Sequence, residues 1–280
     1  MAAQRITTRN ARFQQWQALL TNRRTRQRSG EFLVQGVRPL SQAVAHGWPL
    51  RALLYDPARR PTRWAAELLR EVPAERFAMA PELLAELGEK DEGVPELVGV
   101  AELPGDDLSR IPLGPGFLGL VFDRPTSPGN IGSIVRSADA FGAHGLVVTG
   151  HAADVYDPKS VRASTGSLFA LPVVRAPGHR EVGGWLEAAG PPGVRVVGLD
   201  EGGTDELAAF DLTGPVLLVV GNETTGLSTG WRERCDALVR IPMTGSASSL
   251  NAANAATVVL YEAARQRAAA GAPTTAAPAR

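Results

Sequence analysis

Short apolar runs alternate with stretches of helical spacing along the first part of the chain. The apolar runs are typical of short strands, and the segments between them carry apolar residues three and four positions apart, as helices do. The predicted strands are residues 32–35, 53–55, 76–79 and 97–103, and the predicted helices are residues 39–46, 64–72 and 81–87. We therefore expect a compact α/β unit of about a hundred residues, the size of a small domain.

A second alternating region begins at Phe117. Its predicted strands are residues 117–122, 146–148, 194–199, 216–220 and 237–241, and its predicted helices are residues 131–141, 158–168 and 249–269. Continuous apolar strands that alternate with helices predict a parallel sheet covered by helices on both faces. A stretch rich in Pro, Gly and Asp separates the two regions, so we expect domains at residues 1–107 and 108–270. Residues 271–280, rich in Ala, Pro and Thr, are expected to form a disordered tail.

The first thirty residues concentrate positive charge, although 29 basic and 29 acidic residues give the whole chain no net charge. Seven arginines precede the first acidic residue, Glu31: Arg5, Arg9, Arg12, Arg23, Arg24, Arg26 and Arg28. Arginine binds phosphate in a planar, bidentate way, and clustered basic charge is typical of RNA-binding segments. We expect these arginines to contact RNA. The alternative is a solvated arm, in a chain whose coding bias favours arginine over lysine.

The same segment has the spacing of a helix over residues 10–27. Phe13, Trp16 and Leu20 would lie on one stripe of this helix, with arginines beside it. Most tryptophans belong to cores, yet the basic neighbours of Trp16 make base stacking an open alternative.

Composition excludes several classes of protein. Hydrophobic residues make up 44% of the chain and charged residues 21%, as in ordinary globular proteins. The lone Cys235 and four scattered histidines offer neither an internal disulfide nor a metal-ligand cluster, so we expect a metal-free protein. No apolar run approaches the roughly 18 residues of a membrane span, so we expect a cytoplasmic location without membrane contact. The glycines of residues 114–119 match a dinucleotide fingerprint but precede a strand, where the fingerprint must follow one.

Three segments place glycines and polar side chains directly after predicted strands. They are residues 123–136, 221–228 and 241–254. Open α/β sheets bind their ligands at the carboxyl ends of their strands, so we expect these segments to form one site.

These segments resemble the three motifs of the SpoU (TrmH-like) RNA 2′-O-ribose methyltransferases, a family of the SPOUT superfamily. Asn130 and Arg136 match the first motif, Glu223 with Gly226-Leu-Ser matches the second, and Ile-Pro-Met at residues 241–243 with Ser249-Leu-Asn251 matches the third. The arginine-rich start and the first α/β unit are similar to the L30-like RNA-binding domain of rRNA-directed members. The overall resemblance is greatest to actinobacterial members that modify 23S rRNA and confer resistance to antibiotics such as avilamycin.

The resemblance implies a deep trefoil knot in the second domain and a homodimer with its catalytic site at the interface. It implies S-adenosylmethionine as methyl donor and no metal. Carried over to this chain, the cofactor would contact Gly221, Ile241 and Leu250, with Asn222 and Met243 nearby. The expected reaction is methyl transfer to a ribose 2′-hydroxyl of RNA, most readily 23S rRNA. A tRNA substrate and a non-catalytic RNA-binding protein remain the alternatives.

The resemblance also assigns roles to side chains. Family proposals make Arg136 the base, but arginine stays protonated at neutral pH, so we favour a clamp on the 3′ phosphate of the target nucleotide. We expect Asn130 to orient Arg136, and Glu223 to fix this network or its own loop. Ser249 and Asn251 are expected to point toward the ribose. As alternatives, Asn130 and Ser249 suit helix N-termini, and Glu223 could be a structural carboxylate. Residues 252–254 are Ala-Ala-Asn, where many members of the family have Val-Ser-Val, so the role of Asn254 is left open.

Overall fold

The computed structural model describes residues 4–88 and 93–271, and contacts between Cα atoms divide the chain into two compact units. The first unit extends to Pro104 and also includes Tyr156–Ala170. The second unit comprises Gly105–Val155 and the chain from Leu171 onward. We expected a single boundary near residue 107, and the assignment of Tyr156–Ala170 to the first unit was not foreseen. The expected tail lies, beyond Gly271, outside the described residues.

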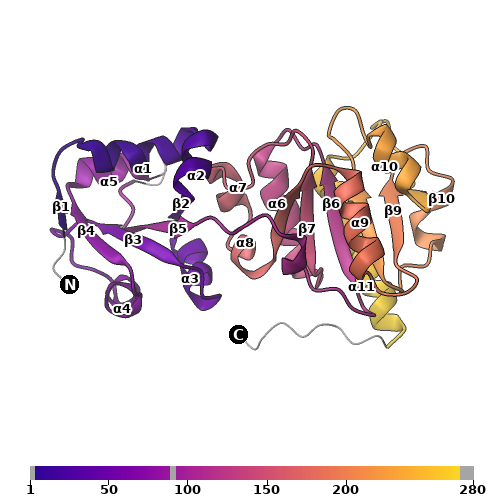
Figure 1. Ribbon diagram of the computed structural model, residues 1–280, viewed down its shortest axis with the longest axis horizontal. Coiled ribbons are helices and arrows are strands. Elements are labelled where there is room, and N and C mark those ends of the chain that lie inside the picture. Colours follow the sequence, from indigo (N-terminus) through magenta and orange to yellow (C-terminus); the bar gives the residue numbers. More distant parts are fainter. Residues whose placement is uncertain (1–3, 89–92, 272–280) are drawn as a thin grey trace. The chain divides into compact units, whose positions relative to one another are not determined.

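The first unit is built on a mixed sheet of five strands in the order β1-β4-β3-β5-β2. The strands are β1 (Gln4–Ile6), β2 (Glu31–Gln35), β3 (Leu50–Tyr55), β4 (Glu75–Met79) and β5 (Leu97–Glu102). The helices are α1 (Ala11–Thr21), α2 (Arg23–Ser29), α3 (Val37–Ala45), α4 (Arg63–Glu71), α5 (Pro81–Leu87), α7 (Pro158–Ala163) and α8 (Ser167–Ala170). Figure 1 shows α1, α2 and α5 along one face of this sheet and α3 and α4 along the other. The expected α/β unit is thus present, with an additional edge strand, β1.

The basic N-terminal segment forms two helices where we predicted one. Asn22 ends α1, and its side-chain oxygen accepts the backbone N–H of Thr25, 3.1 Å away, as the N-cap of α2. Phe13, Trp16 and Leu19 are the buried side chains of α1, whereas the predicted Leu20 is only partly buried. This apolar face packs on the sheet, so α1 belongs to the core of the first unit.

Aromatic contacts hold Tyr156–Ala170 in the first unit. The ring of Phe32 lies 4.9 Å from that of Tyr156 and 6.2 Å from that of Phe169. The indole N–H of Trp48 donates to the backbone oxygen of Phe169 at 3.0 Å. The single helix predicted over residues 158–168 is broken because Thr165 and Gly166 have positive φ angles of 50° and 99°. Alternating apolar positions could not reveal this break.

The second unit contains an all-parallel sheet of seven strands in the order β10-β12-β9-β11-β6-β7-β8. The strands are β6 (Leu118–Asp123), β7 (Gly145–Thr149), β8 (Val173–Ala176), β9 (Arg195–Leu199), β10 (Asp205–Glu206), β11 (Val216–Val220) and β12 (Ala237–Arg240). The helices are α6 (Pro128–Ala140), α9 (His179–Ala189), α10 (Thr229–Arg234) and α11 (Ala252–Ala269), with short 3₁₀ turns η1 (Leu108–Arg110) and η2 (Leu207–Ala209). The predicted parallel sheet is confirmed.

Helices cover both faces of this sheet, as predicted. Val182 and Leu186 of α9 and Trp231 of α10 pack against strand residues on one face, whereas α6 and α11 pack against each other on the other face. Four helices and strands of the second unit escaped the sequence analysis: β8, α9, β10 and α10. They lie among prolines and glycines that interrupt the hydrophobic period. Because all seven strands run in parallel, the loops after β6, β9, β11 and β12 meet at one edge, which positions the site.

Candidate functional site

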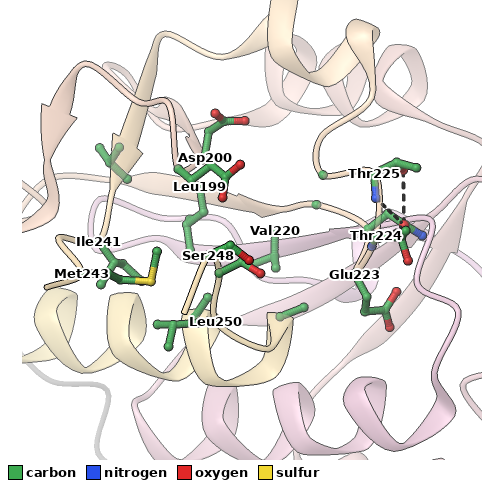
Figure 2. A pocket seen from close by; sticks show the side chains of 18 of the residues that line it. Leu199, Asp200, Val220, Glu223, Thr224, Thr225, Ile241, Met243, Ser248 and Leu250 are labelled. Carbon is green, nitrogen blue, oxygen red and sulfur yellow. Dashed lines mark hydrogen bonds between the residues drawn. The ribbon is translucent and has the colours of Figure 1, made fainter. Parts of the chain in front are cut away.

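A cavity of about 470 Å³ lies at the carboxyl ends of β9, β11 and β12, next to the start of α11. Leu199, Val220, Ile241, Met243 and Leu250 provide its apolar walls. Figure 2 shows Ile241 and Met243 on one side of the cavity and the loop that carries Glu223 on the other. Met243 and Leu250 are 38% and 39% exposed, so the cavity presents apolar surface to an incoming ligand. An apolar slot among convergent polar groups suits a purine ring.

All five residues predicted to bind a cofactor line this cavity: Gly221, Asn222, Ile241, Met243 and Leu250. Gly221 is required by close packing, because a Cβ atom there would lie 2.3 Å from the backbone carbon of Gly226. Asn222 shapes the loop, since its Oδ1 accepts the backbone N–H groups of Thr224 at 2.9 Å and Thr225 at 3.0 Å. The loop after β11 is therefore folded tightly on itself beside the cavity.

The carboxylate of Glu223 joins this loop to the start of α6. It accepts the backbone N–H and hydroxyl of Thr126, both at 3.0 Å, the backbone N–H of Ser127 at 3.1 Å, and the amide Nδ2 of Asn130 at 3.1 Å. Burial raises the pKa of Glu223, but the N–H donors together lower it below its ordinary value of 4.5. A carboxylate that accepts four hydrogen bonds is a poor proton acceptor. Glu223 therefore acts as a fixed anion that holds the loop after β11 to the start of α6.

Asn130 and Asn251 continue this network to α11. The amide Nδ2 of Asn251 donates to Oδ1 of Asn130 at 3.2 Å. The Oδ1 atom of Asn251 accepts the backbone N–H of Ala253 at 2.9 Å, which makes Asn251 the N-cap of α11. The predicted helix start at Ser249 was therefore too early, because the cap lies at Asn251. The structure thus connects three of the predicted catalytic residues, one from each of the three segments.

Arg136 stands apart from this network. Its side chain is exposed and has no hydrogen-bond or ion-pair partner among the described residues. It follows Asn130 by six positions, which is a rotation of about 240° around the helix, so the two side chains do not share a face. The expectation that Asn130 orients Arg136 was wrong for a single chain, because Asn130 engages Glu223 and Asn251. Ser249 lines the cavity, and its exposed side chain has no partner within the described part of the chain.

Sequence reasoning missed Asp123, the last residue of β6, and Arg124, which follows it. The buried carboxylate of Asp123 accepts the backbone N–H of Ser228 at 2.9 Å and the guanidinium Nε of Arg124 at 3.1 Å. Arg124 also donates to the backbone oxygen of Gly226 at 2.9 Å and has an unusual positive φ of 53°. These two residues hold the loops after β6 and β11 together. Their position at the end of a buried strand was the available signal.

The arginines predicted to contact RNA differ in exposure. Arg5, Arg12, Arg24 and Arg28 are exposed, Arg23 is half-buried, and Arg9 is exposed and paired with Glu86. Arg26 is 2% exposed, and its guanidinium donates to the backbone oxygen of Leu19 and faces Asp157 at 3.7 Å. Its assignment to RNA was therefore wrong, because a buried cation with protein partners cannot reach a phosphate.

Trp16 is also a core residue. It is 2% exposed and meets the ring of Phe77 edge-on at 4.9 Å. The stacking of an RNA base on Trp16 is excluded by this burial. The guanidinium of Arg12, an exposed residue, lies 5.8 Å from the centroid of the indole ring.

Residues 4–88 and 93–271 hold no group of three or more His, Cys, Asp or Glu side chains placed to bind a metal ion. None of their helices is long and apolar enough to cross a membrane.

Two family profiles match this chain. The SpoU rRNA Methylase family matches residues 118–261, and the SpoU L30e-like domain matches residues 10–99. The first range contains the cavity and the network from Glu223 to Asn251. The second range falls within the first unit.

Individual relatives match nearly the whole chain. A 23S rRNA (uridine(2479)-2′-O)-methyltransferase from Streptomyces viridochromogenes is 67% identical over 269 residues, which are 95% of this chain and 93% of the relative. The crystal structure of the SpoU methyltransferase AviRb from the same species, in complex with AdoMet, has a TM-score of 0.89 and 66% identity, and the match covers 93% of this chain and 99% of that chain. An AdoMet-bound rRNA methyltransferase from Sinorhizobium meliloti has a TM-score of 0.82 and 30% identity, with coverage of 94% and 98%.

Proposed function

Because the chain belongs to the SpoU rRNA Methylase family, we propose that it transfers a methyl group from S-adenosylmethionine to a ribose 2′-hydroxyl of 23S rRNA. The observation that carries this proposal is the cavity at the strand ends, beside the network that joins Glu223, Asn130 and Asn251. The relative from Streptomyces viridochromogenes, a 23S rRNA methyltransferase by name, supports the RNA class.

The residues of the cavity fit the cofactor. Ile241, Met243 and Leu250 offer apolar surface for an adenine ring, and the close-packed Gly221 leaves the slot open beside it. When bound, S-adenosylmethionine supplies a methyl group on a sulfonium cation. The chain must then bind and orient the ribose hydroxyl, and the expected gain comes from this alignment.

Arg136 is the residue proposed to hold the RNA at the reaction centre. A guanidinium that remains protonated at neutral pH suits a clamp on the phosphate 3′ of the target nucleotide better than it suits a base. The hydroxyl proton would leave late and partly to that phosphate. Glu223 would keep the start of α6 in place, and Ser249 would offer its free hydroxyl toward the ribose.

A homodimer would complete the site. Arg136 has no partner among residues 4–88 and 93–271 of its own chain, and it lies on α6, which packs with α11. In our proposal two copies associate so that Arg136 of one copy serves the cavity of the other. The trefoil knot and the cytoplasmic location stay predictions of the family resemblance.

The N-terminal arginines other than Arg26 are proposed to bind the RNA outside the reaction centre. Arg5, Arg9, Arg12, Arg23, Arg24 and Arg28 remain candidates for phosphate contacts after the exclusion of Arg26. Resistance to an antibiotic that binds 23S rRNA is the proposed biological consequence. An increased minimal inhibitory concentration of avilamycin in a sensitive host that expresses the chain would support it.

The test uses S-adenosylmethionine with a radiolabelled methyl group. The protein is incubated separately with 23S rRNA and with bulk tRNA from a host that lacks the gene, and the RNA is digested to nucleosides. Label in a 2′-O-methylnucleoside of 23S rRNA is the expected result, and Arg136→Ala serves as the inactive control. Label in tRNA would change the substrate, label in a base would overturn ribose methylation, and no binding of the cofactor would favour a non-catalytic RNA-binding protein.

A further inference from the structure

Arg232 is the sole cationic side chain among the described residues that line the cavity. Three carboxylates line it as well, those of Asp200, Glu201 and Glu223. Glu223 is occupied by its four donors, whereas Asp200 and Glu201 lie on the loop after β9. One wall of the cavity therefore pairs the cation of Arg232 with the carboxylate of Asp200, and Glu201 follows Asp200 in the same loop.

This pair of charges has a rigid support. Asp200 follows β9, and its Oδ1 accepts the backbone N–H of Gly202 at 2.9 Å, while its Oδ2 accepts the guanidinium Nη2 of Arg232. The Asp200 side chain is 11% exposed and that of Arg232 is 47% exposed. A carboxylate held by its own turn thus fixes a guanidinium that still reaches solvent.

The helix that carries Arg232 is anchored by its neighbour. Trp231 is buried, and its indole N–H donates to the hydroxyl of Thr149 at 3.2 Å. Asp200 is the one hydrogen-bond acceptor of the Arg232 side chain within the described part of the chain. A guanidinium has five N–H donors, so most of them remain available to a ligand in the cavity.

S-adenosylmethionine carries one anionic group, the carboxylate of its amino-acid end, next to an ammonium group. A guanidinium binds a carboxylate through two parallel hydrogen bonds, and it needs a fixed orientation to do so. We propose that Arg232 binds the carboxylate of the cofactor's amino-acid end, and that Asp200 is the positioning residue that orients Arg232. This assignment rests on the proposed function and names the group that selects the amino-acid end of the cofactor.

The proposal predicts which ligands respond to a change at Arg232. S-adenosylmethionine and S-adenosylhomocysteine both contain the amino-acid end. 5′-Methylthioadenosine keeps the adenine, the ribose and the sulfur but lacks this end. A residue that binds the carboxylate must affect the first two ligands and spare the third.

Isothermal titration of these three ligands with the wild-type protein and Arg232→Gln tests the proposal. Arg232→Gln removes a hydrogen bond between two charged groups. We therefore expect it to lower the affinity for S-adenosylmethionine and S-adenosylhomocysteine by about 10- to 100-fold. The affinity for 5′-methylthioadenosine should change by less than about 2-fold, which also shows that the variant is folded. Arg240→Gln is the matched control, because Arg240 pairs with Glu206 and does not line the cavity.

Asp200→Asn tests the positioning role. The variant should raise the KM for S-adenosylmethionine and leave kcat at saturating cofactor close to the wild-type value, since Asp200 does not contact the reacting atoms in this proposal. Arg232→Lys should retain part of the affinity because it keeps the charge.

Two results would overturn the assignment. An equal loss of affinity for 5′-methylthioadenosine would mean that Arg232 supports the nucleoside or the loop, and unchanged affinity for all three ligands would mean that it binds none of them. A wild-type protein that binds none of the three ligands would instead overturn the proposed function, and the assignment with it.

Discussion

The side chains of Asn130 and Asn251 form a 3.2 Å hydrogen bond that connects two positions 121 residues apart. The bond joins the first turn of α6 to the N-cap of α11. Asn130 also donates a hydrogen bond to the carboxylate of Glu223. Three loops at the edge of the sheet are thus held in register by side-chain amides. The precision of the site depends on this chain of contacts.

Asn251→Ala should impair both stability and turnover. Loss of the N-cap is expected to lower the free energy of unfolding by about 1 kcal/mol. Displacement of the loops at the reaction centre is expected to lower kcat by about 100-fold. Urea unfolding and methyl transfer at saturating substrates measure the two effects separately.

Asn251→Ser and Asn254→Ala are the controls for this prediction. Serine caps a helix well but lacks the amide donor to Asn130, so it should restore stability and not turnover. Asn254 is exposed in the first turn of α11, and its replacement should leave both quantities near the wild-type values. Full turnover in Asn251→Ser would show that the bond to Asn130 is dispensable.

Glu223→Gln should lose stability in a pH-dependent way. The pKa of Glu223 is lowered in the folded protein, so its ionised form stabilises the fold at pH values above the ordinary 4.5. This contribution is lost as the pH falls below 4.5 and through the lowered pKa. The difference in melting temperature between the wild type and Glu223→Gln should therefore be largest near neutral pH and shrink in acid. A difference that grows in acid would contradict a depressed pKa.

Arg136→Lys distinguishes a bidentate contact with the RNA phosphate from electrostatic attraction between the two charges alone. Lysine keeps the charge but cannot form the planar, two-pronged contact, so RNA binding should persist in part while kcat falls by about 100-fold or more. Filter binding and single-turnover methyl transfer measure the two quantities. Wild-type turnover in Arg136→Lys would contradict the clamp.

The proposed homodimer leads to a complementation experiment. Arg136→Ala would lack the clamp, and Gly221→Val would displace the loop after β11 that lines the cofactor cavity, because even a Cβ atom collides with the backbone of Gly226. Refolding a mixture of the two variants should restore activity in hybrid dimers if Arg136 serves the cavity of the other copy. Absence of activity in hybrid dimers that are present by mass spectrometry would place each site within one chain.

Arg26→Ala should lower the stability of the protein, whereas Arg28→Ala should weaken its binding to RNA. Removal of the buried Arg26 leaves the backbone oxygen of Leu19 and the carboxylate of Asp157 without their cation, at an expected cost of about 3 kcal/mol. Arg28 is exposed, so its removal should spare stability and weaken RNA binding, with a lower salt dependence. Equal loss of stability in both variants would contradict the distinction.

Much of the fold could be predicted from the sequence, because buried parallel strands such as β6 and β11 read as unbroken apolar runs. The site could be located because its residues follow those strands directly. Composition could not identify Arg26 as a core residue, since its partner Asp157 lies far along the chain. Likewise, spacing placed Asn130 and Arg136 on one helix, but the face of each side chain became evident only from the contacts of Asn130 with Glu223 and Asn251.

The placement of α7 and α8 in the first unit bears on how such enzymes exchange parts during evolution. A recombination event at Pro104 would deliver the sheet of the first unit without Phe169, which contacts both Phe32 and Trp48. It would also separate Arg26 from Asp157. A functional chimera must therefore inherit Tyr156–Ala170 together with the N-terminal segment, so the first unit of this chain is encoded by two separate stretches of its gene.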